Sequence, residues 1–115
     1  MELSTVRPIT LLIAAMGGEG GGVLTSWIVN AARSCGLPVQ ATSIPGVAQR
    51  TGATTYYIEI WPEVLSVGAT KPVLALAPAI GEIDILAATE YVETGRMIEA
   101  GYVTPDRTTL IASNH

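Results

Sequence analysis

The chain has 115 residues, with 6 Lys and Arg against 10 Asp and Glu, one Cys and one His. Charged residues make up 14% of the sequence, where roughly 25% is usual, and apolar residues make up 49%. Disorder is excluded because it needs low hydrophobicity and high net charge. Nucleic-acid binding is excluded because a net charge of −4 supplies no basic stripe.

The single cysteine and the single histidine narrow the chemistry further. Cys35 alone cannot make an internal disulfide, a zinc site or an iron–sulfur cluster, since each needs several thiolates or imidazoles. The single histidine, His115, is the last residue, so there is almost no histidine available for Ser-His-Asp or Cys-His catalysis. We therefore expect no catalytic side chains and no metal site in this chain. The protein is expected to be cytoplasmic, and Cys35, on the apolar face of a predicted helix, is expected to be a buried small hydrophobe.

The low charge content has a second implication, for the surface. Most residues of a small domain lie near its surface, so few charges predict that a partner covers part of it. The longest apolar stretch, Ile9–Met16, is far shorter than the roughly 20 residues of a membrane-spanning helix. Arg7 before this stretch would also suit a signal peptide, but Pro8 and the glycines that follow favour a strand and a turn.

The first predicted elements are a strand, a glycine loop and a helix. Residues 9–15 are a short apolar run, typical of a strand buried on both faces of a parallel sheet. The loop 17–22 follows, and from Val23 the apolar period becomes helical. Gly36 is expected just past the helix end, where Pro38 prevents continuation. Two rows form the apolar stripe expected to face the core: Val23, Trp27, Ala31 and Cys35, and beside them Leu24, Ile28 and Ala32.

Further strands and a second helix are predicted along the rest of the chain. Thr89 can cap a helix that runs through about Ala100, and Pro62 opens a surface loop over residues 62–72. Strands are predicted at 39–43, 54–61, 73–77, 84–88 and 108–112. This alternation predicts an α/β fold, a three-layer, mostly parallel Rossmann-like sheet with helices on both faces. Residues 1–115 are expected to form a single domain, and the chain to be part of a longer polypeptide.

The glycine loop predicts an anion site, because it places backbone N–H groups and the positive end of the helix dipole at one point. Neither nucleotide fingerprint is met. Counted from Gly18, Val23 stands where a dinucleotide motif needs its third glycine, and Val23 also stands where a phosphate loop needs lysine. Three interpretations stay open: a tight turn with close backbone packing, a site for a phosphate or cofactor fragment, and a contact with a partner subunit.

The second loop, residues 45–52, is expected near the same sheet edge, where ligands of open α/β sheets bind. Arg50 has a planar, permanently charged guanidinium group that suits a carboxylate or a phosphate. Gln49 supplies both a donor and an acceptor. The alternative is a solvated loop in which Arg50 pairs with a nearby acid.

The two loops appear in a fixed order in the chain: Gly17-Gly18-Glu19-Gly20-Gly21-Gly22-Val23-Leu24, then Pro45-Gly46-Val47-Ala48-Gln49-Arg50-Thr51-Gly52. Together with the later stretches 82–90 and 103–111, they resemble the gamma domain of 2-oxoacid:ferredoxin oxidoreductases. The indolepyruvate type, in its beta subunit, looks most similar. In the family's first loop Glu19 replaces a glycine and Gly21 replaces a glutamine. In the second loop Pro45, Val47 and Thr51 differ, while Gly46, Gln49, Arg50 and Gly52 agree.

The resemblance implies a fold like domain III of pyruvate:ferredoxin oxidoreductase and a subunit that is inactive alone. Its complex would convert an aryl pyruvate such as indolepyruvate, with coenzyme A, to an acyl-CoA, CO2 and reduced ferredoxin. Thiamine diphosphate, magnesium and the iron–sulfur clusters would belong to a large partner subunit. The residues implied to line a substrate or CoA site are Gly18, Gly20, Gly21, Gly22, Gln49 and Arg50. The alternatives are a stand-alone module for a phosphorylated ligand or flavin, and a purely architectural subunit.

Overall fold

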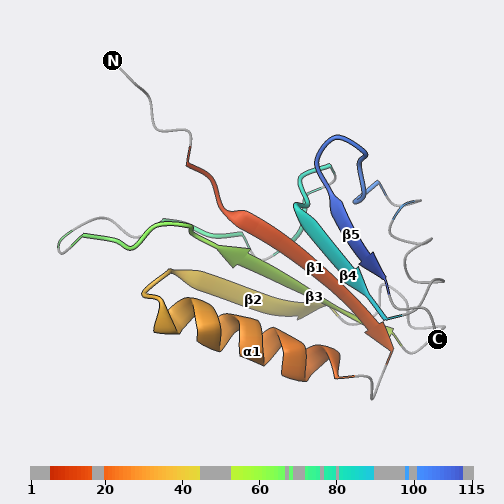
Figure 1. Cartoon of the computed structure of the whole chain (residues 1–115), viewed down its shortest axis with the longest axis horizontal. Coiled ribbons are helices and arrows are strands. Elements are labelled where there is room, and N and C mark those ends of the chain that lie inside the picture. Colours follow the sequence, from red (N-terminus) through yellow and green to blue (C-terminus); the bar gives the residue numbers. More distant parts are fainter. Residues whose placement is uncertain are drawn as a thin grey trace.

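The structure, a computed structural model, describes residues 6–16, 20–44, 53–66, 68, 72–75, 77–79, 81–89, 98 and 101–112. The elements in chain order are β1 (Ile9–Met16), α1 (Gly21–Ser34), β2 (Val39–Ile44), β3 (Ala53–Ile60), β4 (Ile85–Ala88) and β5 (Thr109–Ala112) (Figure 1). The α/β class is confirmed. The strands predicted at 9–15, 39–43, 54–61, 84–88 and 108–112 are all present, each within two residues of its predicted bounds.

The strands form one sheet in the order β2-β3-β1-β4-β5. β1 pairs in parallel with β4, and β4 with β5, whereas β3 pairs antiparallel with both β1 and β2. Among the described strands, β3 therefore runs against four that share one direction. The sheet is mixed in its pairing but mostly parallel in strand direction, and β3 lies between the two strands that α1 connects.

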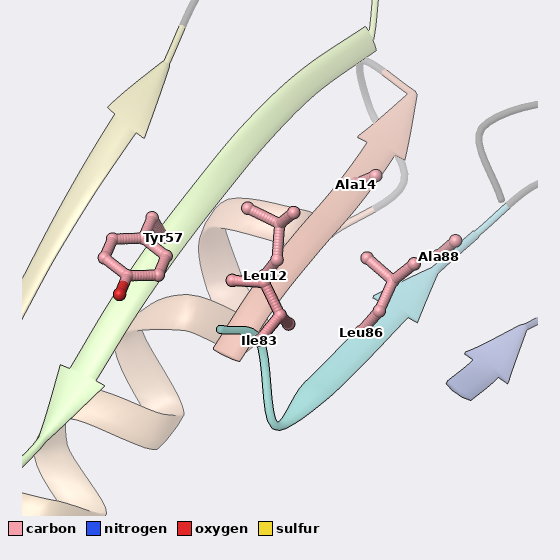
Figure 2. Packing of buried hydrophobic residues seen from close by; sticks show 6 residues of the cluster. All are labelled: Leu12, Ala14, Tyr57, Ile83, Leu86 and Ala88. Carbon is pink, nitrogen blue, oxygen red and sulfur yellow. The ribbon is translucent and has the colours of Figure 1, made fainter. Parts of the chain in front are cut away.

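β1 is the central strand and is buried on both faces, as its apolar sequence predicts. Four successive side chains, Leu12 to Ala15, are each at most 2% exposed. The core cluster on one face joins three strands and the segment before β4. Its residues are Leu12, Ala14, Tyr57, Ile83, Leu86 and Ala88 (Figure 2). The opposite face is covered by α1, which packs against β1, β2 and β3.

The end of α1 follows the pattern that the sequence predicts. Gly36 has a φ of +77°, in the left-handed region that favours glycine. Its N–H donates to the Arg33 carbonyl at 3.0 Å, and the Leu37 N–H donates to the Ala32 carbonyl at 2.9 Å. These two bonds form a Schellman closure of the helix, after which Pro38 cannot continue it.

The buried face of α1 differs from the predicted stripe. The buried helix residues are Gly21, Thr25 and Ala32, whereas Val23 is 54% exposed and Trp27 is 68% exposed. Cys35 is exposed too, so the prediction of a buried thiol was wrong. The helix is oriented by its glycine start, which packs directly on β1, and this places the row of Val23 and Trp27 on the outside.

The predicted strand 73–77 is also wrong for the residues that the structure describes there, which have no regular secondary structure. The Ala75 N–H donates to the side chain of Glu59 at 2.8 Å instead of to a neighbouring strand. The helix predicted over 89–100, which would cover the second face of the sheet, falls mostly outside the described residues. Within the described part of the chain, no helix is long and apolar enough to span a membrane.

Candidate functional site

The connection from β1 to α1 is a glycine turn whose last residue is left-handed. Gly20 precedes the helix with a φ of +81° and has no neighbouring atom within 4 Å of a Cβ placed on it. Its carbonyl accepts the first helical hydrogen bond, from the Leu24 N–H at 2.9 Å. No side chain among the described residues caps the helix, and no acidic residue lies in its first turn. The first-turn N–H groups and the positive end of the helix dipole therefore lie together at this turn.

The two glycines that follow differ in how closely they are packed. A Cβ on Gly21 would lie 2.6 Å from the Ala15 Cβ of β1 and 3.0 Å from Cε2 of Tyr56. A Cβ on Gly22 would lie 3.3 Å from the Tyr56 hydroxyl. The Thr25 hydroxyl donates to the Gly21 carbonyl at 2.8 Å, which satisfies the buried hydroxyl. The interpretation as a tight turn with close backbone packing therefore holds for Gly21, and Gly22 lies in looser contact with Tyr56.

A pocket of about 280 Å³ lies in front of this turn, at the carboxyl ends of β1, β4 and β5. It is lined by Ile13, Gly20, Gly21, Leu24, Ala87, Ala88, Thr89, Ile111 and Ala112. This is the sheet edge where open α/β folds bind their ligands. None of these lining residues is charged, so any anion bound here would rely on the backbone N–H groups and on residues beyond the lining.

The residues predicted for the site divide into three groups. Gly20 and Gly21 line the pocket, while Gly22 does not and faces Tyr56 instead. Gly18, Gln49 and Arg50 lie outside the described residues. The contributions of β4 and β5 to the pocket were missed, because these small apolar residues carry no chemical signal in the sequence.

A second site, which is polar, was not predicted from the sequence. It lies at the end of the sheet opposite to the glycine turn. Glu59 on β3 is only 7% exposed. One of its carboxylate oxygens accepts a hydrogen bond from the Tyr57 hydroxyl and the other from the Ala75 N–H. Burial and the hydrogen bond to Glu59 raise the pKa of Tyr57 well above its ordinary range. Figure 2 shows the Tyr57 hydroxyl directed along β3, away from Ala14 and Ala88.

An ion-pair network adjoins this site. The Arg107 guanidinium donates through Nε to Asp84 at 3.0 Å and through Nη1 to Glu82 at 2.9 Å. Asp84 in turn accepts from the Thr10 N–H at 2.9 Å, and the Asp84 N–H donates to the Thr10 hydroxyl, also at 2.9 Å. The network ties β1 to the segments that lead into β4 and β5. The sequence gives no sign of it, since its members are far apart in the chain.

The described residues offer no ligand set for a metal ion or an iron–sulfur cluster. Among them, no three His, Cys, Asp or Glu side chains are grouped so that they could hold a metal ion. The exposed Cys35 by itself cannot ligate an iron–sulfur cluster. No step through thiamine diphosphate, magnesium or a cluster is therefore assigned to this chain.

Comparison with known proteins agrees with this architecture. The model of the family described as pyruvate ferredoxin/flavodoxin oxidoreductase matches residues 10–115, nearly the whole chain. No curated protein matches the sequence significantly.

Solved structures share the fold at low sequence identity. A pyruvate oxidoreductase subunit, PORC, from Thermotoga maritima superimposes with a TM-score of 0.67 at 17% identity, over 94% of this chain and 51% of its own. The 2-oxoglutarate:ferredoxin oxidoreductase from Magnetococcus marinus gives 0.57 at 18% identity, over 92% of this chain and 19% of its own. A keto/oxoacid ferredoxin oxidoreductase gamma subunit from Geobacter sulfurreducens gives 0.55 at 16% identity, over 92% and 61%. The chain thus spans between 19% and 61% of the length of these proteins.

Proposed function

Because the chain belongs to the pyruvate ferredoxin/flavodoxin oxidoreductase family, we propose that it is a non-thiamine subunit of a 2-oxoacid:ferredoxin oxidoreductase. The observation that carries the proposal is the family match over residues 10–115. The order of the two loops, which resembles the indolepyruvate type, supports an aryl pyruvate as the substrate. With coenzyme A the complex would form an acyl-CoA and CO2 and pass the electrons to ferredoxin.

The role proposed for this chain is to complete one wall of the substrate or CoA site. The pocket at the carboxyl edge offers an apolar lining and, beside it, the N–H groups of the first turn of α1. Such N–H groups bind carboxylates and phosphates. In this proposal Gly20 and Gly21 present these donors, Arg50 pairs with a ligand anion, and Gln49 orients it. Gly18 would shape the turn before Gly20.

The proposal places thiamine diphosphate, magnesium and iron–sulfur clusters in a large partner subunit, where they would supply decarboxylation and electron transfer. An exposed apolar row on α1 supports a partner of this kind. Val23 and Trp27 are more than half exposed, and Leu24 beside them is 38% exposed. Apolar patches of this kind mark protein contacts. The row begins next to the glycine turn, so a subunit covering it would also approach the pocket.

Co-purification tests the proposal. We expect the full chain, tagged in its source organism, to bring down a larger subunit that contains thiamine diphosphate and iron–sulfur clusters. The assembled complex should reduce ferredoxin in a CoA-dependent reaction, faster with indolepyruvate than with pyruvate or 2-oxoglutarate. A chain that purifies alone and binds flavin tightly would instead identify a stand-alone binding module. Preference for pyruvate or 2-oxoglutarate would refute only the aryl pyruvate assignment.

The role of Arg50 is tested in the same complex. Arg50→Ala should raise the KM for CoA or for the 2-oxoacid by about tenfold or more, because a charge-assisted hydrogen bond to the ligand is lost. Arg33→Ala is the matched control, since Arg33 is exposed in the last turn of α1, far from the pocket. Unchanged kinetics of Arg50→Ala in an intact complex would favour the purely architectural role.

A further inference from the structure

A second cleft, of about 420 Å³, lies at the sheet edge opposite to the glycine turn. Its volume falls in the range typical of small-molecule sites. Two carboxylates, Glu59 and Glu82, and two guanidinium groups, Arg7 and Arg107, line it. The pocket at the carboxyl edge has no charged lining residue, so the two cavities have different chemistry.

Glu59 is the unusual group in this cleft. Its side chain is almost fully buried, yet both of its hydrogen-bond donors, the Tyr57 hydroxyl and the Ala75 N–H, are neutral. Within the described part of the chain, no Lys or Arg forms an ion pair with it. Buried carboxylates in proteins are usually paired with a cation, because an unpaired buried charge is costly. The cleft therefore presents a fixed carboxylate that a cationic ligand would compensate.

The two arginines differ in whether a carboxylate of the described residues already pairs with them. Arg107 is already neutralised by Asp84 and Glu82, at 3.0 and 2.9 Å. Arg7 is exposed, and no carboxylate among the described residues pairs with it. Once the Arg107 network is set aside, the cleft has one buried negative group, Glu59, and one exposed positive group, Arg7.

Small side chains also line the cleft. Three exposed alanines at alternate positions of one segment, Ala75, Ala77 and Ala79, form one wall of the cleft. The Ala75 N–H also holds the Glu59 carboxylate in place. The wall is therefore anchored to the charged group and lined by methyl groups.

We propose that this cleft binds a small zwitterion of the α-amino acid class. The ligand's ammonium group would pair with Glu59 and its carboxylate with Arg7, while a short side chain would contact the alanine wall. This inference uses no residue of the glycine turn and does not depend on the proposed function. It assigns to the chain a binding site additional to the one at the carboxyl edge.

Calorimetric titration of the full chain, together with any subunits that co-purify, tests the proposal with three probes. L-Alanine should bind saturably at millimolar concentration. Propionate lacks the ammonium group and ethylamine lacks the carboxylate, so each should bind more weakly than L-alanine. Glu59→Gln should weaken L-alanine binding by about 30-fold or more, because it removes one charge of a buried pair. Glu63→Gln removes the same charge from an exposed residue outside the cleft, and should leave binding unchanged.

A second variant covers the case in which Glu59→Gln fails to fold, as judged by circular dichroism. Ala77→Leu fills the cleft while retaining the carboxylate, and should abolish binding. The proposal is overturned if L-alanine does not bind, if propionate binds as tightly as L-alanine, or if L-alanine binding survives either Glu59→Gln or Ala77→Leu.

Discussion

The contact between Gly21 and β1 leads to a prediction that separates packing from helix propensity. In Gly21→Ala the new Cβ would lie 2.6 Å from the Ala15 Cβ, about 1 Å closer than an ordinary carbon–carbon contact. Neither partner can give way easily, since Ala15 belongs to the central strand and Gly21 to the helix backbone. Overpacking of this kind costs about 1–3 kcal/mol, whereas alanine gains at most about 1 kcal/mol over glycine in a helix. The free energy of unfolding should therefore fall by about 1–2 kcal/mol.

Gly22→Ala is the matched control, because it makes the same substitution one residue later. Its Cβ would lie 3.3 Å from the Tyr56 hydroxyl, the far end of a side chain that can shift. This variant should range from unchanged to about 1 kcal/mol more stable, because the gain in helix propensity remains. The two variants should then differ by about 2 kcal/mol, or roughly 8 °C in the midpoint of thermal unfolding.

Urea and thermal denaturation of the full chain, followed by circular dichroism, measure both variants. The reasoning is refuted if Gly21→Ala is as stable as the unmodified protein, or if Gly22→Ala is destabilised as much as Gly21→Ala. In the first case α1 could move away from β1 without cost. In the second case glycine would be required by the backbone of the turn and not by the contact with Ala15.

Two further predictions follow from side chains whose surroundings the structure reveals. Tyr57→Phe removes a donor from the buried Glu59 and should lower the free energy of unfolding by about 1–3 kcal/mol in urea denaturation. Because the folded state raises the pKa of Tyr57 while the unfolded chain ionises near about 10, stability should be retained below about pH 10 and fall above it. Tyr57→Phe should lack this component, and an identical decline in both proteins would contradict the assignment. Cys35 is exposed, so a thiol reagent should modify the native protein nearly as fast as the urea-unfolded chain; strong protection in the native state would restore the original expectation of a buried thiol.

The strands were predictable because their signals are local. The apolar run of β1, the β-branched residues of β3, and Gly36 with Pro38 after α1 each determine structure within a few residues. The face of α1 was not predictable in this way. Its orientation depends on the close approach of Gly21 to β1, and Thr25 can be buried because its hydroxyl bonds to the Gly21 carbonyl. Neither residue contributes to a count of apolar positions.

The site could be predicted only where one segment supplies it. The turn at Gly20 and Gly21 was found from the glycines themselves, whereas the lining from β4 and β5 depends on the strand order. The cluster around Glu59 was missed because its members come together only through the sheet register, in which Thr10 pairs with Glu59 across β1 and β3. The segment 73–77 has the composition of a strand, but its backbone donates to that buried carboxylate instead of to a ladder.

The strand order also determines when the sheet can be completed during synthesis. β1 is at the centre, but its parallel neighbour β4 follows much later, and Thr10 bonds to Asp84 across a separation of 74 residues. At translation rates of about 5–20 residues per second, β1 is synthesised roughly 4–15 seconds before this neighbour. During this interval β3 can already pair with one edge of β1, while the other edge stays open and apolar. The nascent chain is therefore most vulnerable to aggregation and to chaperone capture at β1, the strand that is best protected once the domain has folded.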